Sequence, residues 1–455
     1  MPLNLTSGTY WRYQIKSCTQ ERADYYIKFP NEYDVFSLSQ ETKLILSSSH
    51  IPNLISLYDR IQIDVKVPAP SNFFPTHRKV CFSIAQYMRT RNASENASIV
   101  EKCKNSTTIA YLQSNHYLSN SLTYHHKKYD AVILYSGGKE SVLTYEIMSA
   151  LGFSCICLIV ENEGQAMASQ LAEHLRQIQI PHVTVKTNLC SRDSQWLRSG
   201  VSHWMPKDKK DRRITAFISG TNIHYAVIAH AFAEWHQAQY ILSGDELECQ
   251  AISWYQDLPY VKNWMLDQSP LIYRQWHKLF STASNRKIYY GSVVASLSSL
   301  LIGQLLFNQI KAQGISSYYT SCRVFDCGNS TMRWCLSCPK CFYIYLIIHL
   351  FDIDVTVVGM GKNQEEVEKK LIEFLIHNKE SLSDPIFPED VLGIMAKHLP
   401  KKNIHKSILH LFAKIPSKES VLLYSDLAVM GMDTELQKAV SLFLKNKIDH
   451  NIITV

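Results

Sequence analysis

The sequence has no apolar run long enough to cross a membrane. The longest run, Phe342 to Phe351, is too short to span a bilayer and contains His349. The opening residues, 1–13, do not show the basic and then apolar pattern of a secretion signal. We therefore expect a cytoplasmic protein without a membrane partner.

A strong charge bias and internal repeats are absent as well. The 47 basic and 40 acidic residues give a formal net charge of +7 over 455 residues. This mild positive excess suits polyanionic small molecules as well as nucleic acid. The aromatic and basic residues are scattered rather than clustered, so we expect no nucleic-acid surface. With 46% hydrophobic residues, the chain is long enough for two or three domains with ample cores.

One stretch predicts a phosphate-binding site. Residues 131–134 form a short apolar run typical of a buried parallel strand, and helical periodicity runs from Glu140 to Leu151. The turn between them reads Ser136-Gly137-Gly138-Lys139-Glu140-Ser141. Backbone N–H groups and the positive end of a helix converge at such a turn, where the two glycines let an anion approach closely. The lysine adds positive charge and the serines add hydroxyl donors, which favours a phosphate site over an ordinary glycine turn.

Alternating strand and helix patterns follow this stretch. Strands are predicted at 155–160, 182–185, 239–242 and 288–294, and helices at 167–178, 223–237 and 297–312. Repeated β-α units of this length predict an α/β fold with a doubly wound parallel sheet. The strand at 239–242 ends in Ser243-Gly244-Asp245-Glu246, at the edge where open α/β sheets bind ligands.

Five of the twelve cysteines fall within twenty residues. In a reducing cytoplasm, this clustering indicates metal binding rather than disulfides. Cys335, Cys338 and Cys341 form a CxxCxxC pattern, which can place three thiolates around one tetrahedral ion. The preferred fourth ligand is Cys322, with Cys327 as the substitute. Zinc is the metal we expect, and the alternatives are small buried hydrophobic residues, a redox CxxC motif and an iron–sulfur cluster.

The flanking regions carry no chemistry that the sequence identifies. Residues 1–128 are expected to be β-rich with a linker, and strands are predicted at 10–15, 23–29 and 61–67. The second of these strands ends at a proline, as an edge strand does. Residues 353–455 are expected to be helical, with helices at 365–375, 388–399, 406–413 and 434–444. The catalytic domain is placed between them at 129–352, with a zinc knuckle at 322–341 and an amphipathic helix at 343–350.

The turn at 136–141 resembles the SGGxDS signature of the PP-loop ATP pyrophosphatases, with Glu140 where that family usually has aspartate. It is not the nucleotide P-loop of the GxxxxGK[ST] type, since the first glycine and the spacer are missing. The resemblance implies a HUP-like domain that binds ATP at this turn and cuts it between the α and β phosphates. It also implies a magnesium ion, with Lys139 neutralising phosphate charge and Asp245 helping to hold the metal.

Two branches of that superfamily combine such a domain with a cysteine knuckle. The order of the motifs resembles the cyano-deazaguanine synthases of queuosine biosynthesis, which adenylate a carboxylate and keep a structural zinc. The motif Trp-Cys-x-x-Cys-Pro-Lys-Cys-Phe at 334–342 looks more like the corresponding segment of the UDP-N-acetylmuramoyl-L-alanyl-L-glutamate epimerases of peptidoglycan synthesis. That resemblance implies a nucleotide-linked small molecule whose terminal L-glutamate is adenylated and inverted. The chain departs from the pattern at Glu140 and at 243–246, where an Asn-Glu stretch is expected.

Three functions stay open from the sequence. The first is an ATP-dependent isomerase that works through an acyl-adenylate, with Asp245, Glu246 and His224 as candidate bases near the sheet's carboxyl edge. The second is an enzyme with the same activation step that delivers ammonia or sulfur to a nucleobase or a tRNA. The third is a non-catalytic zinc scaffold with a degenerate PP-loop, and the lysine and serines of the turn argue against it.

Overall fold

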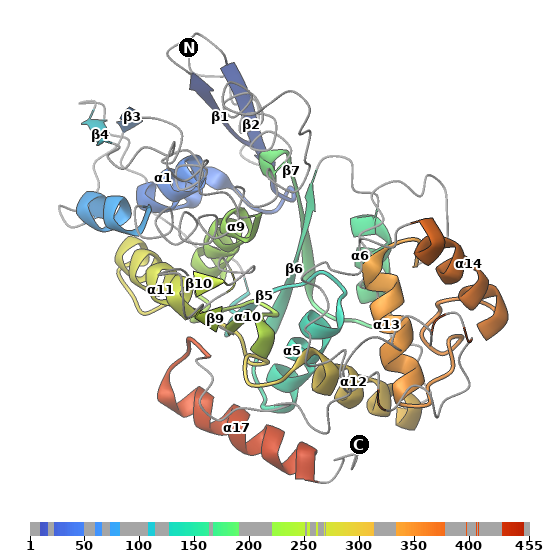
Figure 1. Cartoon of the computed structure of the whole chain (residues 1–455). Helices are drawn as coiled ribbons and strands as arrows, with labels where there is room; N and C mark the ends of the chain where they lie inside the picture. Colours follow the sequence, from blue (N-terminus) through green and yellow to red (C-terminus); the bar gives the residue numbers. More distant parts are fainter. Residues whose placement is uncertain are drawn as a thin grey trace.

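A seven-stranded sheet forms the centre of the protein, with its strands in the order β1-β2-β7-β6-β5-β8-β11 (Figure 1). The computed structural model describes residues 10–16, 22–49, 60–65, 73–81, 108–113, 127–162, 167–190, 221–250, 253–254, 261–262, 268, 270–313, 334–377, 397, 406, 408 and 430–449. The strands of the sheet are β1 (Tyr10–Lys16), β2 (Arg22–Lys28), β5 (Ala131–Leu134), β6 (Cys155–Asn162), β7 (His182–Thr187), β8 (Tyr240–Leu242) and β11 (Tyr289–Gly291).

The five strands from β7 to β11 are parallel to one another. Read across the sheet, they follow in the chain order third, second, first, fourth and fifth. This is the order of a doubly wound, Rossmann-like sheet, in which the direction of winding reverses between β5 and β8. The predicted α/β class with a largely parallel core is therefore confirmed, and ligands of such sheets bind where the winding reverses.

The central strands are apolar because both of their faces are covered. Alternate residues of β5 point to opposite sides, so that Ala131 and Ile133 join one core and Val132 joins the other. The first core contains helices α5 (Lys139–Ala150), α6 (Met167–Gln177), α12 (Ser299–Gln313) and α13 (Pro339–Leu350). The second contains α1 (Gln40–Ser48), α9 (Thr221–His236) and α11 (Pro270–Ser284). Figure 1 shows the two groups of helices on either side of the sheet.

The N-terminal strands extend this sheet. β2 pairs antiparallel with β1 on one side and with β7 on the other, where Ile27 lies opposite Thr187. The strand predicted at 23–29 is confirmed, but its assignment as an edge strand is wrong. Pairing with β7 stops at Lys28, so Pro30 lies beyond the ladder and its missing N–H leaves no gap in it.

Other parts of the first 128 residues are not strands of this sheet. β3 (Arg60–Val65) and β4 (Thr108–Gln113) form a separate parallel pair, and so confirm the strand predicted from residue 61. Besides α1, a helix spans residues 73–81, so the region holds helices that the β-rich prediction did not include.

A further small sheet lies later in the chain, where β9 (Ser253–Trp254) and β10 (Val261–Lys262) pair with each other. The domain boundaries at 128 and 352 stay predictions.

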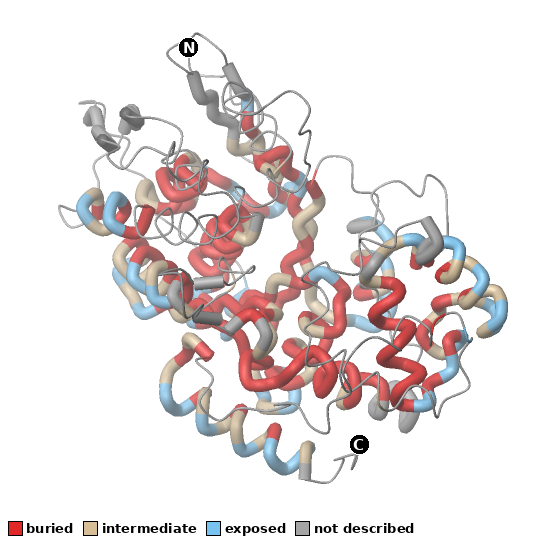
Figure 2. The backbone as a smooth tube through the Cα atoms, in the orientation of Figure 1, coloured by how far each residue is buried: buried red, intermediate tan, exposed pale blue. Residues whose placement is uncertain are grey.

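The helix after the cysteines is buried on all sides, so its prediction as amphipathic is wrong. All residues from Cys341 to Leu350 are buried, as Figure 2 shows for α13. The helix packs so closely on α12 that a Cβ on Gly303 would lie 2.8 Å from Cγ2 of Ile347. On its other side, the Tyr345 hydroxyl donates a hydrogen bond to Glu368 of α14 (Gln364–His377). Two neighbouring helices thus cover the surface that was expected to face solvent.

Two of the predicted C-terminal helices are confirmed as α14 and α17 (Thr434–Asp449). The helices predicted at 388–399 and 406–413 lie almost entirely outside the described residues. The sequence predicted neither α11 nor the short α10 (Leu247–Gln250). Within the described ranges, no helix is both long and apolar enough to cross a membrane.

A buried carboxylate holds α1 against α9. Ser39 caps α1 by accepting a hydrogen bond from the backbone N–H of Thr42. The carboxylate of Glu234 on α9 accepts hydrogen bonds from the backbone N–H of Ser39 at 2.5 Å, from its hydroxyl at 2.8 Å and from the Thr42 hydroxyl. One side chain of α9 therefore satisfies three donors at the start of α1.

We predict that Glu234→Ala lowers the free energy of unfolding by about 3 kcal/mol, because buried donors lose a charged acceptor. The matched control is Glu173→Ala, which removes an exposed carboxylate paired with Arg176 and should change stability by less than about 0.5 kcal/mol. Urea unfolding of both variants measures the difference. Equal effects of the two substitutions would contradict the role assigned to Glu234.

Candidate functional site

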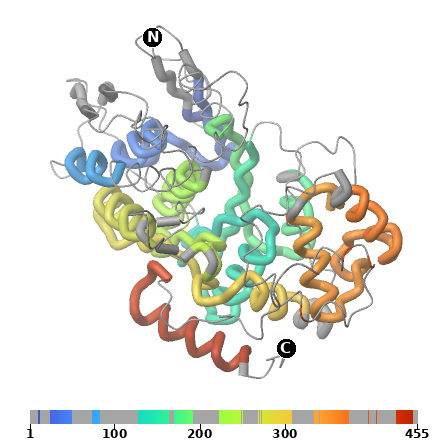
Figure 3. The backbone as a smooth tube through the Cα atoms, viewed as in Figure 1, coloured from blue at the N-terminus to red at the C-terminus, as the bar shows by residue number. Residues whose placement is uncertain are grey.

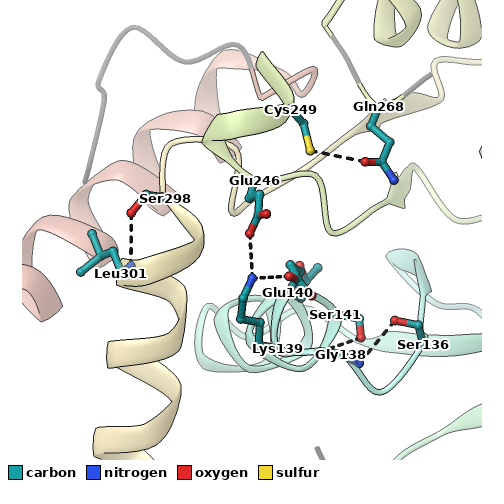
Figure 4. A network of polar contacts seen from close by, with 11 residues as sticks. Ser136, Gly138, Lys139, Glu140, Ser141, Glu246, Cys249, Gln268, Ser298 and Leu301 are labelled. Atoms are coloured by element: carbon teal, nitrogen blue, oxygen red, sulfur yellow. Dashed lines mark hydrogen bonds and ion pairs between the residues drawn. The ribbon is translucent and has the colours of Figure 1, made fainter. Parts of the chain in front are cut away.

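Three loops meet at the carboxyl edge of the sheet, beside the point where the winding reverses. The turn at 136–138 follows β5 and leads into α5, and the loop at 243–246 follows β8. The ammonium group of Lys139 lies 2.7 Å from a carboxylate oxygen of Glu246 and also pairs with Glu140 (Figure 4). Gly244 lies so close to the turn that a Cβ on it would be 2.7 Å from the Cβ of Glu140. Two of the sequence-predicted motifs are thus in direct contact.

The third loop follows β11 and was not predicted as part of the site. Its serines at 292, 296, 298 and 299 are buried. Ser298 directly precedes α12, and its hydroxyl accepts a hydrogen bond from the backbone N–H of Leu301 at 3.2 Å. The Ser299 hydroxyl donates to the Glu246 carboxylate. Sequence reasoning missed this loop because its only signal was a run of serines beside small apolar residues.

The glycine turn has the backbone geometry that its sequence predicts. Gly137 has a φ of +76°, which residues with a side chain rarely adopt. Gly138 occupies the position before the first residue of α5 and supplies no side-chain cap to the N–H groups of the first turn. The Ser136 hydroxyl accepts a hydrogen bond from the Gly138 N–H at 3.3 Å, and the Ser141 hydroxyl donates to the Gly138 carbonyl at 3.0 Å. Both serines therefore stabilise the turn itself.

The lysine of the turn is almost fully buried, and its two acidic partners differ in their electrostatics. Lys139 exposes 2% of its side chain. Burial raises the pKa of Glu140, but the positive charges of Lys139 and Lys340 outweigh it and hold that pKa below its ordinary value. Burial raises the pKa of Glu246, and the negative charge of Glu140 adds to this despite the pull of Lys139. One carboxylate thus stays ionised and the other takes up a proton more readily.

Asp245 lies next to Glu246 in the chain but is hydrogen-bonded to other residues. Its side chain is buried, and its Oδ2 accepts hydrogen bonds from the Ser243 hydroxyl and, at 3.0 Å, from the Tyr273 hydroxyl. Tyr273 belongs to α11, which sequence patterns did not predict. The other candidate base, His224, is buried in α9, with its Nδ1 3.0 Å from the Ser49 hydroxyl.

The three cysteines of the CxxCxxC pattern come together at the start of α13. Their sulfurs all lie within 4.8 Å of one another, and those of Cys335 and Cys341 are 3.8 Å apart. The backbone N–H groups of Ser337 and Cys341 point to the sulfurs of Cys335 and Cys338, each at 3.4 Å. This cluster could hold a metal ion such as zinc.

The spacing of the sulfurs is compatible with the zinc ion that the sequence predicts. Four sulfurs at about 2.3 Å from a zinc ion form a tetrahedron with edges of about 3.8 Å. The three thiols are free, so a disulfide between two of them is not formed. Cys322 and Cys327 lie outside the described residues, so the fourth ligand stays a prediction.

The cysteine cluster and the glycine turn are electrostatically connected. Cys338 caps α13 with its sulfur, and Lys340 follows two residues later between the second and third cysteines. The charge of this lysine acts on Glu140 of the turn. The sequence gave no reason to select Lys340, because a lysine beside metal-binding cysteines is usually a solvated residue.

Comparison of the chain with protein-family models finds no match, and comparison with curated proteins finds no significant similarity. Membership of the PP-loop superfamily therefore stays a prediction. What the structure establishes is the largely parallel sheet, the contact between the two loops and the cysteine cluster.

We predict that the purified protein carries about one zinc ion per chain and that Cys338→Ser lowers both the zinc content and the free energy of unfolding. The control is Cys190→Ser, which changes a half-buried thiol outside the cluster and should leave the zinc content unchanged. Elemental analysis by mass spectrometry and urea unfolding provide the two measurements. Protein without zinc, or with iron instead, would contradict the assignment.

Proposed function

We propose that this protein binds ATP across the loops that follow β5 and β8 and cleaves it between the α and β phosphates. AMP and pyrophosphate are the products, and a substrate carboxylate is adenylated on the way. The observation that carries this proposal is the ion pair between Lys139 and Glu246, at 2.7 Å. It joins a glycine turn at a helix N-terminus to an acidic loop at the switch point, where open α/β sheets bind nucleotides.

The residues of the turn are suited to a polyphosphate. The first turn of α5 has no side-chain cap from Gly138, and its N–H groups and the helix dipole favour an anion there. Lys139 places a buried positive charge at the same helix end. Glu140 competes with phosphate for the positive charge of Lys139, so its carboxylate must move away from the lysine when the nucleotide binds.

The donor set beside the lysine also fits a magnesium ion. Asp245, which is buried next to Glu246 in the chain, offers carboxylate oxygens, which are the ligands that magnesium prefers. Bound there with ATP, magnesium would supply positive charge for the leaving pyrophosphate. The cysteine cluster has sulfur ligands that suit zinc, and with a fourth thiolate it would leave no open position for a reacting group. We therefore assign it a structural role.

We predict that Lys139→Met lowers the rate of pyrophosphate release by more than about tenfold, because phosphate charge is no longer neutralised. Glu140→Gln should instead tighten the binding of ATP, since it removes the competing anion from the lysine. The matched control is Lys370→Met, which changes a half-exposed lysine on α14, far along the chain from the turn. A pyrophosphate-coupled assay and chromatography of the nucleotides measure these effects. Release of ADP and phosphate in place of AMP and pyrophosphate would contradict the proposal.

We further propose that the adenylated group is the carboxylate of a terminal L-glutamate, which the enzyme epimerises. Removing a proton from Cα of a free amino acid places a carbanion beside a negative carboxylate. Conversion to an acyl-adenylate removes that negative charge and makes the α-proton easier to take. After inversion by reprotonation on the other face, water hydrolyses the adenylate and releases AMP. The segment at 334–342, which resembles the muramoyl-dipeptide epimerases, supports this choice of substrate.

Glu246 is our choice for the group that moves the proton. Burial and the negative charge of Glu140 raise the pKa of Glu246, so it takes up a proton more readily than an ordinary glutamate, whereas the pKa of Glu140 is lowered. Two carboxyl groups with pKa values pushed apart are typical of acid–base pairs in enzymes. His224 is bound to Ser49 of the N-terminal region, and Asp245 is bound to two hydroxyls, which suits a fixed ligand better than a base.

We predict that the UDP-muramoyl dipeptide, incubated with ATP, magnesium and the enzyme in deuterated water, yields D-glutamate with deuterium at Cα and one AMP per inversion. Mass spectrometry and chiral analysis of the glutamate measure the outcome. Pyrophosphate release with a deazapurine or a tRNA, and none with the dipeptide, would assign the protein to nucleobase or tRNA modification instead.

A further inference from the structure

The C-terminal segment Met430–Asp433 reaches the carboxyl end of β11. The carbonyl of Met430 accepts a hydrogen bond from the backbone N–H of Ser292 at 2.9 Å. Farther along, Asp433 accepts one from the Tyr240 hydroxyl at 2.5 Å and caps α17 by accepting another from the Leu436 N–H at 2.9 Å. Figure 3 shows α17 in red with its first residues beside the segment that follows β11. The segment is therefore fixed at both ends against the sheet.

Two glycines make this contact possible. A Cβ on Gly291 would lie 1.9 Å from the Met430 carbonyl oxygen and 2.9 Å from Cα of Gly431. A Cβ on Gly431, whose φ is +75°, would lie 2.4 Å from the Tyr290 carbonyl oxygen and 2.8 Å from Cδ2 of Tyr273. The two backbones can approach so closely only because neither position has a side chain.

Tyr273 connects this segment to the candidate site. Its ring lies against Gly431 on one side and packs near Tyr290, with ring centroids 5.9 Å apart. Its hydroxyl donates the 3.0 Å hydrogen bond to Asp245. The side chain is 1% exposed, so it cannot move without displacing either the segment or the carboxylate.

We propose that Tyr273 is a positioning residue that orients the Asp245 carboxylate for a divalent cation, and that Met430–Asp433 holds Tyr273 in place. This inference rests on the proposed function, in which Asp245 helps to hold the magnesium ion. The proposal gives the segment Met430–Asp433 a role in the site, although this segment lies outside the three loops that form the site. Hydrogen bonds to a metal-binding carboxylate fix its direction, and their removal typically lowers metal affinity by about 10- to 100-fold.

The test measures Mn²⁺ affinity of the zinc-loaded protein by electron paramagnetic resonance. Tyr273→Phe keeps the ring and removes the hydroxyl, so we expect Mn²⁺ affinity to fall by about tenfold. Asp245→Asn should lower it further. The matched control is Tyr289→Phe, which removes a hydroxyl from a half-buried tyrosine of β11 and should leave the affinity unchanged. Gly431→Ala should reproduce the effect of Tyr273→Phe, because its Cβ would displace the tyrosine ring.

The outcomes separate this inference from the proposed function. If Asp245→Asn lowers Mn²⁺ affinity and Tyr273→Phe does not, the positioning role is overturned and the metal site stands. If neither variant changes the affinity, both the positioning role and the metal role of Asp245 are overturned. Urea unfolding of Gly431→Ala shows whether it folds, and the two remaining variants decide the question if it does not.

Discussion

The buried ammonium group of Lys139 is the constraint around which the site is arranged. A charge with 2% of its side chain exposed must be paired, and the carboxylates of Glu140 and Glu246 provide the pairing. Breaking one such buried pair typically costs about 3–5 kcal/mol, because an uncompensated charge is left behind. The loops after β5 and β8 are therefore held in contact, and Gly244 is required where they touch. The contact between the two loops and the anion binding that we propose therefore depend on the same group.

Segments from both ends of the chain support this arrangement. β2 extends the sheet beyond β7, and α1 is attached to α9 through Glu234. From the other end, Met430–Asp433 closes against β11, and α13 packs against α12 in the core that also contains α5. The parallel strands alone would leave two faces and two edges uncovered. These distant segments cover both faces and leave the carboxyl edge for the site.

The cysteine cluster and the glycine turn are connected through the charge of one lysine. The cluster lies at the start of α13, and Lys340 within it acts on Glu140 of the turn. A metal ion there would fix the backbone around this lysine, so the cluster would act on the anion site that we propose without touching the ligand. Glu140 pairs directly with Lys139, and the charge of Lys340 also helps to hold the pKa of Glu140 below its ordinary value.

The amino-acid sequence by itself determined the local units of this protein. The apolar run of β5, the glycine turn and the periodicity of α5 depend on neighbouring residues, as does the spacing of Cys335, Cys338 and Cys341. Tertiary structure decided the contacts of Tyr273 with Asp245, of Met430 with Ser292 and of β2 with β7. It also decided that α13 is buried on all sides. Local patterns reflect hydrogen bonds and burial within a few residues, whereas these contacts join residues that only the packing of the whole chain brings together.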